Sequence, residues 1–68
     1  MRADEVSTGQ VVVDSGGDVW AHKRGRWGYI NDRGEFSSWD THSALPSGFE
    51  PYVALSEQAA RAIKGNIA

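Results

Sequence analysis

Basic and aromatic side chains alternate in one short part of this chain, between Asp18 and Gly34, and they form its clearest candidate for binding chemistry. Guanidinium and ammonium groups can pair with acidic groups of a partner, and indole rings can fill an apolar pocket. Trp20 is the expected buried anchor of such an interface, with Arg24 and Arg26 as charges at its rim. We therefore expect a partner-binding site made of Trp20, His22, Lys23, Arg24, Arg26 and Arg33.

The same residues also have a structural interpretation, and the sequence leaves both open. Trp and Tyr rings supply much of the buried area of a very small domain, and charged residues at a hairpin tip protect a strand edge. Single-stranded nucleic acid also binds where aromatic and basic side chains alternate. We expect the nearby acids Asp18, Asp32 and Glu35 to cancel part of the positive field. A protein partner is therefore favoured over nucleic acid.

No group of residues forms a catalytic or metal-binding motif. Asp40, His42 and Ser43 are the residue types of a hydrolytic triad, but a triad needs side chains that converge from separate elements. The two histidines lack the spacing of metal ligands, and the chain has no cysteine. The segment from Asp14 to Asp18 lacks the alternating acids and the distal Glu of a calcium loop. We predict that the protein is not an enzyme and uses no cofactor.

Length and charge narrow the class further. A chain of 68 residues is one domain with a small core, because a domain of about 60 residues buries only about 60% of its unfolded surface. A net charge of −2 and a pI of about 5.5 argue against a general nucleic-acid coat protein. The longest apolar run is Val11-Val12-Val13, so we expect no membrane partner, and the acidic start predicts no signal peptide.

Turn residues divide the chain into short strands followed by a helix. We predict a small α+β fold, a three- to four-stranded antiparallel β-meander with one C-terminal α-helix packed across it. Residues 1–9 are expected to form a flexible polar tail, residues 10–65 the single domain, and residues 66–68 a C-terminal tail. A helical turn capped by Asp40 or Thr41 is expected within 39–45. The runs that predict strands cover residues 10–13, 18–23, 26–31, 35–37 and 51–54.

The C-terminal helix has the clearest boundary signals. Ser56 is a suitable N-cap, and Gly65 stands where a helix commonly ends in a left-handed residue. Leu55, Ala59 and Ile63 are spaced by four residues and predict a narrow apolar stripe. Because so short a helix is not stable alone, we expect this stripe to pack on the strands.

Two registers are possible for the central hairpin. A two-residue loop, Arg24-Gly25, places Trp20 opposite Tyr29 and gathers four rings on one face, but it requires a positive φ at Arg24. A three-residue loop, Lys23-Arg24-Gly25, requires a left-handed residue only at Gly25 and places Trp20 opposite Gly28. We expect the three-residue loop, because it imposes no strain on Arg24.

Two resemblances add an expectation about origin. The stretch Gly25-Arg26-Trp27-Gly28-Tyr29-Ile30-Asn31-Asp32-Arg33-Gly34 resembles a single unit of the WG-type β-repeats, and this implies a Trp-containing strand followed by a Gly turn. Over residues 11–55 the chain also resembles small accessory proteins of actinobacterial phages. That resemblance implies a phage origin and a small twisted β-sheet, and the helix from Ser56 departs from it. It is carried by Gly17-Asp18-Val19-Trp20, Arg26-Trp27, Ser38-Trp39-Asp40 and Pro51-Tyr52-Val53-Ala54-Leu55.

Together these observations predict a non-enzymatic phage protein that binds a host or phage protein through its hairpin. The first alternative is a structural protein of the virion, such as a capsid decoration or minor capsid protein. The second alternative is an accessory protein that binds nucleic acid. The expected location is the host cytoplasm or the virion, and so small a core is compatible with a homo-oligomer that pairs through an exposed strand.

Overall fold

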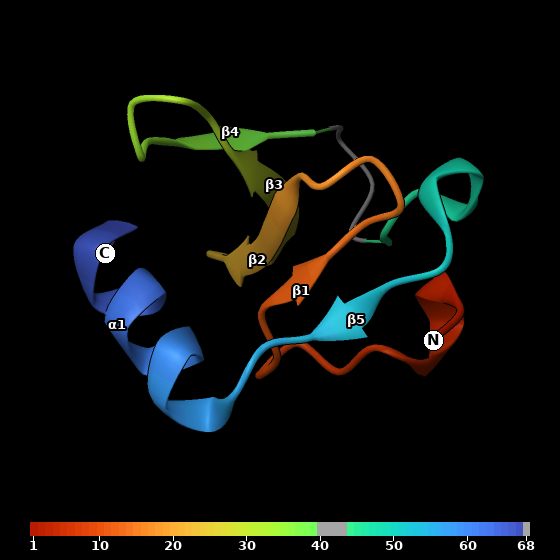
Figure 1. Ribbon diagram of the computed structural model, residues 1–68. Coiled ribbons are helices and arrows are strands. Elements are labelled where there is room, and N and C mark those ends of the chain that lie inside the picture. The colour runs from red at the N-terminus through yellow and green to blue at the C-terminus, as the bar shows by residue number, and fades with distance from the viewer. Residues whose placement is uncertain (40–43, 68) are drawn as a thin grey trace.

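Five short strands form one antiparallel sheet in the computed structural model, which describes residues 1–39 and 44–67 (Figure 1). The order of the strands across the sheet is β4-β3-β2-β1-β5. The expected helical turn within 39–45, with its cap at Asp40 or Thr41, lies mostly outside the described residues. The strands are β1 Val12–Val13, β2 Val19–Lys23, β3 Arg26–Ile30, β4 Phe36–Ser38 and β5 Val53–Ala54.

The predicted α+β class is confirmed, and the sheet has one strand more than the predicted three- to four-stranded meander, because the run 51–54 also joins it as β5. Strands β1 to β4 form a meander in which each is antiparallel to the next. The chain then returns across the molecule, and β5 pairs with the free side of β1. The α-helix α1, Glu57–Ile67, follows β5, and two short 3₁₀ helices precede the first and last strands, η1 at Ala3–Glu5 and η2 at Ser47–Phe49.

Each face of the sheet carries its own small core. The face away from α1 holds the aromatic core, and the face under α1 holds the helix core. Ala3 and Val6 of the N-terminal segment pack on the aromatic core, so the sheet lies between that segment and α1 (Figure 1). The buried residues of the aromatic core are Val12, Trp20, Trp27, Leu45 and Tyr52, and those of the helix core are Val11, Ala21, Ala60 and Ile67.

The expected register of the β2–β3 hairpin was wrong. Trp20 pairs with Tyr29 and His22 with Trp27, so the loop has two residues, and Arg24 adopts a φ of 53°. A three-residue loop would shift one strand by one position and place Trp27 on the face opposite to Trp20. Burying both indoles in one core stabilises the fold by more than the roughly 1–2 kcal/mol that a left-handed Arg costs. Core packing therefore overrides the local backbone preference.

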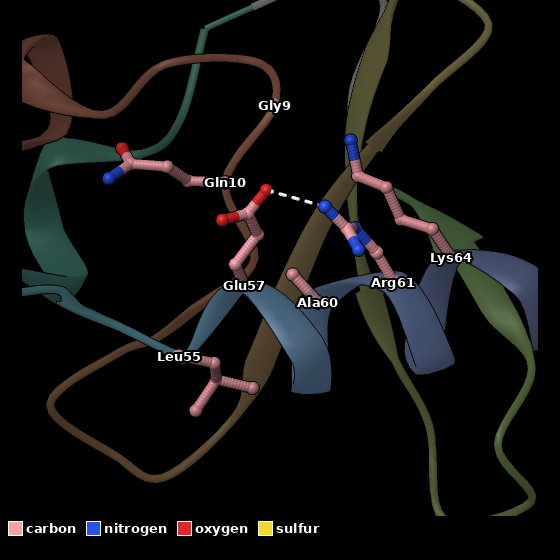
Figure 2. A pocket seen from close by; sticks show the side chains of 7 residues that line it. All are labelled: Gly9, Gln10, Leu55, Glu57, Ala60, Arg61 and Lys64. Atoms are coloured by element: carbon pink, nitrogen blue, oxygen red, sulfur yellow. Dashed lines mark hydrogen bonds and ion pairs between the residues drawn. The ribbon is translucent and has the colours of Figure 1, made fainter.

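Helix α1 begins as predicted and ends later. The N–H of Ala59 donates a hydrogen bond of 3.1 Å to Oγ of Ser56, which confirms the N-cap. The helix continues through Gly65 to Ile67, so the expected end at Gly65 was wrong. The buried side chain of Ile67 explains the extra residues, because it adds apolar area to the helix core. Figure 2 shows Ala60 on the inner side of α1 and the Glu57–Arg61 ion pair beside it.

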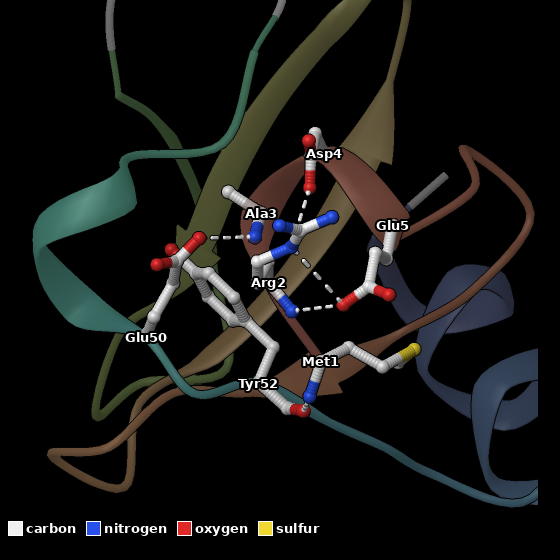
Figure 3. Close-up of polar contacts among 7 residues, drawn as sticks. All are labelled: Met1, Arg2, Ala3, Asp4, Glu5, Glu50 and Tyr52. Carbon is white, nitrogen blue, oxygen red and sulfur yellow. Dashed lines mark hydrogen bonds and ion pairs between the residues drawn. The ribbon is translucent and has the colours of Figure 1, made fainter.

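Residues 1–9, expected to form a flexible tail, are placed against the sheet. The N–H of Tyr52 donates to the carbonyl of Met1 at 2.8 Å, and the Met1 ammonium donates to the carbonyl of Tyr52 at 2.6 Å (Figure 3). The N–H of Ala3 donates to Oε2 of Glu50 at 2.5 Å, and Nζ of Lys64 donates to the carbonyl of Thr8. The N-terminal segment is therefore bound to the chain next to β5 and to α1 by backbone and side-chain hydrogen bonds.

Candidate functional site

Trp20, the expected anchor of a binding surface, lies inside the protein. Its side chain is only 2% exposed, and its indole N–H donates a 2.8 Å hydrogen bond to the buried carboxylate of Asp14. The rings of Tyr29, Trp39 and Phe49 lie around it, with centroids 5.6–6.0 Å from the Trp20 centroid. Trp20 is therefore an aromatic-core residue and offers no free surface to a partner.

The side chain of Lys23 binds the C-terminal end of helix α1. Its ammonium group donates a hydrogen bond to the carbonyl of Ile67 and lies 5.6 Å from the centroid of the Phe36 ring. A cation at the C-terminus of a helix is stabilised by the carbonyls that have no partner within the helix. We therefore assign Lys23 a structural role, which the sequence did not reveal because it depends on where the helix ends.

Arg33 lies in a different part of the surface. It belongs to the turn between β3 and β4, where Oδ1 of Asn31 accepts hydrogen bonds from the N–H groups of Arg33 and Glu35. This turn follows the last residue of β3, whereas the β2–β3 loop precedes the first residue of that strand. The two turns are therefore separated by the full length of β3, and the six expected residues do not form one site.

Three of the expected residues, His22, Arg24 and Arg26, lie at or next to the β2–β3 turn, and we call this group the hairpin tip. His22 pairs with Trp27 and faces the aromatic core, whereas Arg26 pairs with Lys23 and faces the opposite side of the sheet. Arg24 and Gly25 have φ angles of 53° and 82°, the combination of a type I′ turn. The side chains of Arg24 and Arg26 are exposed and form no ion pair with any described residue. His22 is half-buried, with its ring edge-on to Trp27 at 5.3 Å. The tip thus presents two guanidinium groups, one in the two-residue loop at Arg24 and one at the first residue of β3, Arg26.

The acids that we expected to weaken this positive field lie at the other end of the sheet. Val19 pairs with Ile30, so the turn before β2 and the turn after β3 are neighbours, and they hold Asp18, Asp32 and Glu35. Five residues of β3 span about 16 Å, which is about twice the screening length of about 8 Å at physiological salt. At the hairpin tip the expected cancellation is therefore small, whereas Arg33 lies in the same turn as Asp32 and Glu35.

The structure also exposes two aromatic rings that the sequence did not single out. Trp39 is 46% exposed and Phe49 is 36% exposed, and their ring centroids are 5.6 Å apart. Trp39 lies two residues after Ser37, whose partner is Tyr29, so alternation along β4 places Trp39 on the same face as Tyr29. The sequence did not show this, because it did not fix the pairing of β3 with β4. No sequence signal placed Phe49, because it reaches the sheet through the long return from β4 to β5.

Two shallow hollows are present among the described residues. One, of about 320 Å³, lies between α1 and residues 9 and 10, and its apolar lining residues are Leu55 and Ala60 (Figure 2). The other, of about 500 Å³, lies beside η1 and is bordered by Trp27 and Leu45. Polar groups at both rims are already paired within the chain, Arg61 with Glu57 and the Ala3 N–H with Glu50. Neither hollow therefore offers a convergent set of unpaired polar groups.

Three further observations concern the described residues as a whole. No three His, Asp or Glu side chains within 1–39 and 44–67 are grouped as metal ligands would be. No helix in this part of the chain is both long enough and apolar enough to cross a bilayer. Comparisons with protein-family models, with curated proteins and with solved structures found no match to this chain.

Proposed function

We propose that this protein binds an acidic protein surface through the hairpin tip formed by His22, Arg24 and Arg26. The observation that carries the proposal is the backbone of Arg24, which has a φ of 53° at the tip of the loop. Asn, Asp or Gly is strongly preferred at that position of a type I′ turn, and Arg has no local hydrogen bond to compensate for the strain. Strained residues of this kind cluster at functional sites, where the side chain has another use.

The chemistry of the tip fits a carboxylate-bearing partner. Each guanidinium group can donate two parallel hydrogen bonds to one carboxylate, and charge-assisted bonds of this type are about twice as strong as neutral ones. The two-residue turn fixes the backbone that carries both arginines, so less conformational entropy is lost on binding. Because Arg24 and Arg26 form no ion pair with a described residue, their positive charge also accelerates the encounter with an acidic surface.

A nucleic-acid partner is less well supported by the same geometry. Only Arg24, Arg26 and His22 are grouped at the tip, so few phosphates can be neutralised, and the net charge of −2 opposes a polyanion. The large rings that bases would stack on belong to the cores, apart from the exposed parts of Trp39 and Phe49. The idea that the partner is a host or virion protein rests on the resemblance to phage accessory proteins.

The experiment compares the tagged parent protein with three variants in affinity capture from cell lysate, followed by quantitative mass spectrometry. Arg24→Asn removes one of the two guanidinium charges of the tip and suits the turn, so a loss of binding does not come from unfolding. Arg33→Gln removes the same charge from the distant β3–β4 turn and is the matched control.

The expected result is an acidic protein retained by the parent and by Arg33→Gln, reduced at least tenfold for Arg24→Asn, and released as salt is raised. Equal retention by Arg24→Asn and by a double variant that adds Arg26→Gln would refute the proposal.

A further inference from the structure

The two edge strands of the sheet, β5 and β4, differ in whether other parts of the chain cover their outward backbone groups. Beside β5, the outward backbone groups of Tyr52 pair with Met1, and Glu50 accepts the N–H of Ala3 (Figure 3). The N-terminal segment therefore covers the start of this edge. Natural proteins cover or charge their sheet edges because unpaired backbone groups are templates for another strand.

The opposite edge, at β4, has no such cover from the described residues. The N–H of Trp39 donates to the carbonyl of Trp27, and the N–H of Asn31 donates to the carbonyl of Glu35, so alternate residues of β4 point toward β3. The backbone groups of Phe36 and Ser38 must then point away from the sheet. No hydrogen bond from a described residue reaches them. This edge also lacks the Lys, Pro or bulge that commonly blocks pairing.

We infer that the β4 edge pairs with the β4 edge of a second copy of this chain. The geometry fixes the register: Phe36 pairs with the partner's Ser38, Ser38 pairs with the partner's Phe36, and the two-fold axis passes beside Ser37. Each pair exchanges two hydrogen bonds, so the four outward groups of each copy are all satisfied. The two sheets join into one continuous antiparallel sheet.

Side chains along β4 suit this symmetric register. Ser37, on the axis, meets the partner's Ser37, and two small side chains allow the strands to approach. Glu35 is opposite the partner's Trp39, so the acids of the two copies do not face each other. Trp39, 46% exposed in the single chain, lies on the same face as Ser37 and gains cover from the partner's strand. The β4 edge therefore combines three features that favour pairing with a second copy. Its outward backbone groups are complementary to themselves, it exposes an indole, and no like charges face each other across the axis.

The strand is short, and this sets the strength of the pairing. β4 has three residues, and interfaces at the small end of the range are weak and transient. We expect a monomer–dimer equilibrium that shifts over protein concentrations from about 10 µM to 1 mM. The inference does not depend on the hairpin tip, which lies in the loop on the other side of β3 from β4.

Cysteine cross-linking tests the register directly, because the chain has no cysteine of its own. In the proposed dimer the Cβ atoms at position 37 face each other in a non-hydrogen-bonded pair, about 4.5–5.5 Å apart, close to disulfide geometry. The matched control is Ser38→Cys, whose partner across the axis is displaced by two residues and lies beyond disulfide reach. Under mild oxidation, Ser37→Cys should form a disulfide-linked dimer at least tenfold faster than Ser38→Cys.

A blocking variant and an unmodified chain complete the test. Ser38→Pro removes an outward donor without touching the β3–β4 ladder, and it should slow the cross-linking of Ser37→Cys at least tenfold. In the parent protein, hydrogen exchange at Phe36 and Ser38 should slow as concentration rises, whereas Ala54 at the other edge should not change. The inference would be overturned if the two cysteine variants cross-linked at equal rates. It would also be overturned if the hydrogen-exchange rates of Phe36 and Ser38 did not change with protein concentration.

Discussion

The indole N–H of Trp20 donates a 2.8 Å hydrogen bond to the carboxylate of Asp14, and both side chains are buried. The other carboxylate oxygen of Asp14 accepts the N–H groups of Gly16 and Asp18, at 2.8 and 2.9 Å. Burial by itself raises the pKa of Asp14, but these hydrogen bonds outweigh it and hold the pKa below its ordinary value of 3.8. One carboxylate thus joins the β1–β2 turn to the aromatic core.

Replacing Asp14 should therefore cost more than replacing an ordinary turn residue. Asp14→Ala leaves the buried indole N–H and two turn N–H groups without their acceptor, and we expect the free energy of unfolding to fall by about 2–3 kcal/mol. The measurement is urea denaturation followed by tryptophan fluorescence. Asp18→Asn, at an exposed side chain in the same turn, is the control and should change stability by less than about 0.5 kcal/mol. Equal effects of the two changes would contradict this role.

The same carboxylate should make the fold sensitive to acid. Because the pKa of Asp14 is lower in the folded protein, its contribution to stability is complete above about pH 3.8 and is lost as the pH falls further. We expect a decrease in the free energy of unfolding below that pH in the parent, and a shallower decrease in Asp14→Asn. Denaturation curves between pH 2 and pH 6 measure this difference. Parallel pH profiles would show that Asp14 is not the group responsible.

Tyr52 should give the opposite dependence at high pH. Burial, followed by the negative charges of Asp14 and Glu50, raises the pKa of Tyr52 to about 12. The folded protein therefore holds this proton more tightly than the unfolded chain. Its contribution, on the order of 2–3 kcal/mol, is complete below pH 10 and is lost as the pH rises toward 12.

Tyrosinate absorbance provides the measurement for Tyr52. The chain has two tyrosines, so a Tyr29→Phe background leaves Tyr52 as the only titrating phenol. We expect it to ionise near pH 12, or at the pH of unfolding if this comes first. Ionisation near pH 10 in the folded protein would show that the phenol and its 2.6 Å hydrogen bond to the carbonyl of Pro46 are not protected.

Gly28 should tolerate no side chain. A Cβ atom at this position would lie 2.4 Å from the carbonyl oxygen of Ser37 and 2.6 Å from Cζ of Phe36. The ring can move but the neighbouring strand cannot, so we expect Gly28→Ala to destabilise the protein by about 1–3 kcal/mol or more and to loosen β4. Gly48→Ala, where no atom lies within 4 Å, is the control for urea denaturation. Similar midpoints for both variants would contradict the close approach of β3 and β4.

Sequence reasoning succeeded where local signals and packing agree. The strands and the N-cap at Ser56 follow from turn residues and side-chain types that act within a few positions. It failed where distant contacts decide. The end of α1 depends on the buried side chain of Ile67 and on Lys23, which is 44 residues away from it. The candidate site was only partly predicted for the same reason, because residue types alone did not show that Trp20 is buried.

The left-handed backbone of Arg24 leads to the last prediction, in which stability and binding change in opposite directions. Asn is the preferred residue at this turn position, so Arg24→Asn should raise the free energy of unfolding by about 0.5–1 kcal/mol while it weakens partner binding. Arg26→Gln, in a strand with ordinary backbone, should leave stability within about 0.5 kcal/mol. Urea denaturation of the three proteins decides the matter. If Arg24→Asn is no more stable than the parent, Arg24 is not strained, and the observation on which the proposed function rests is removed.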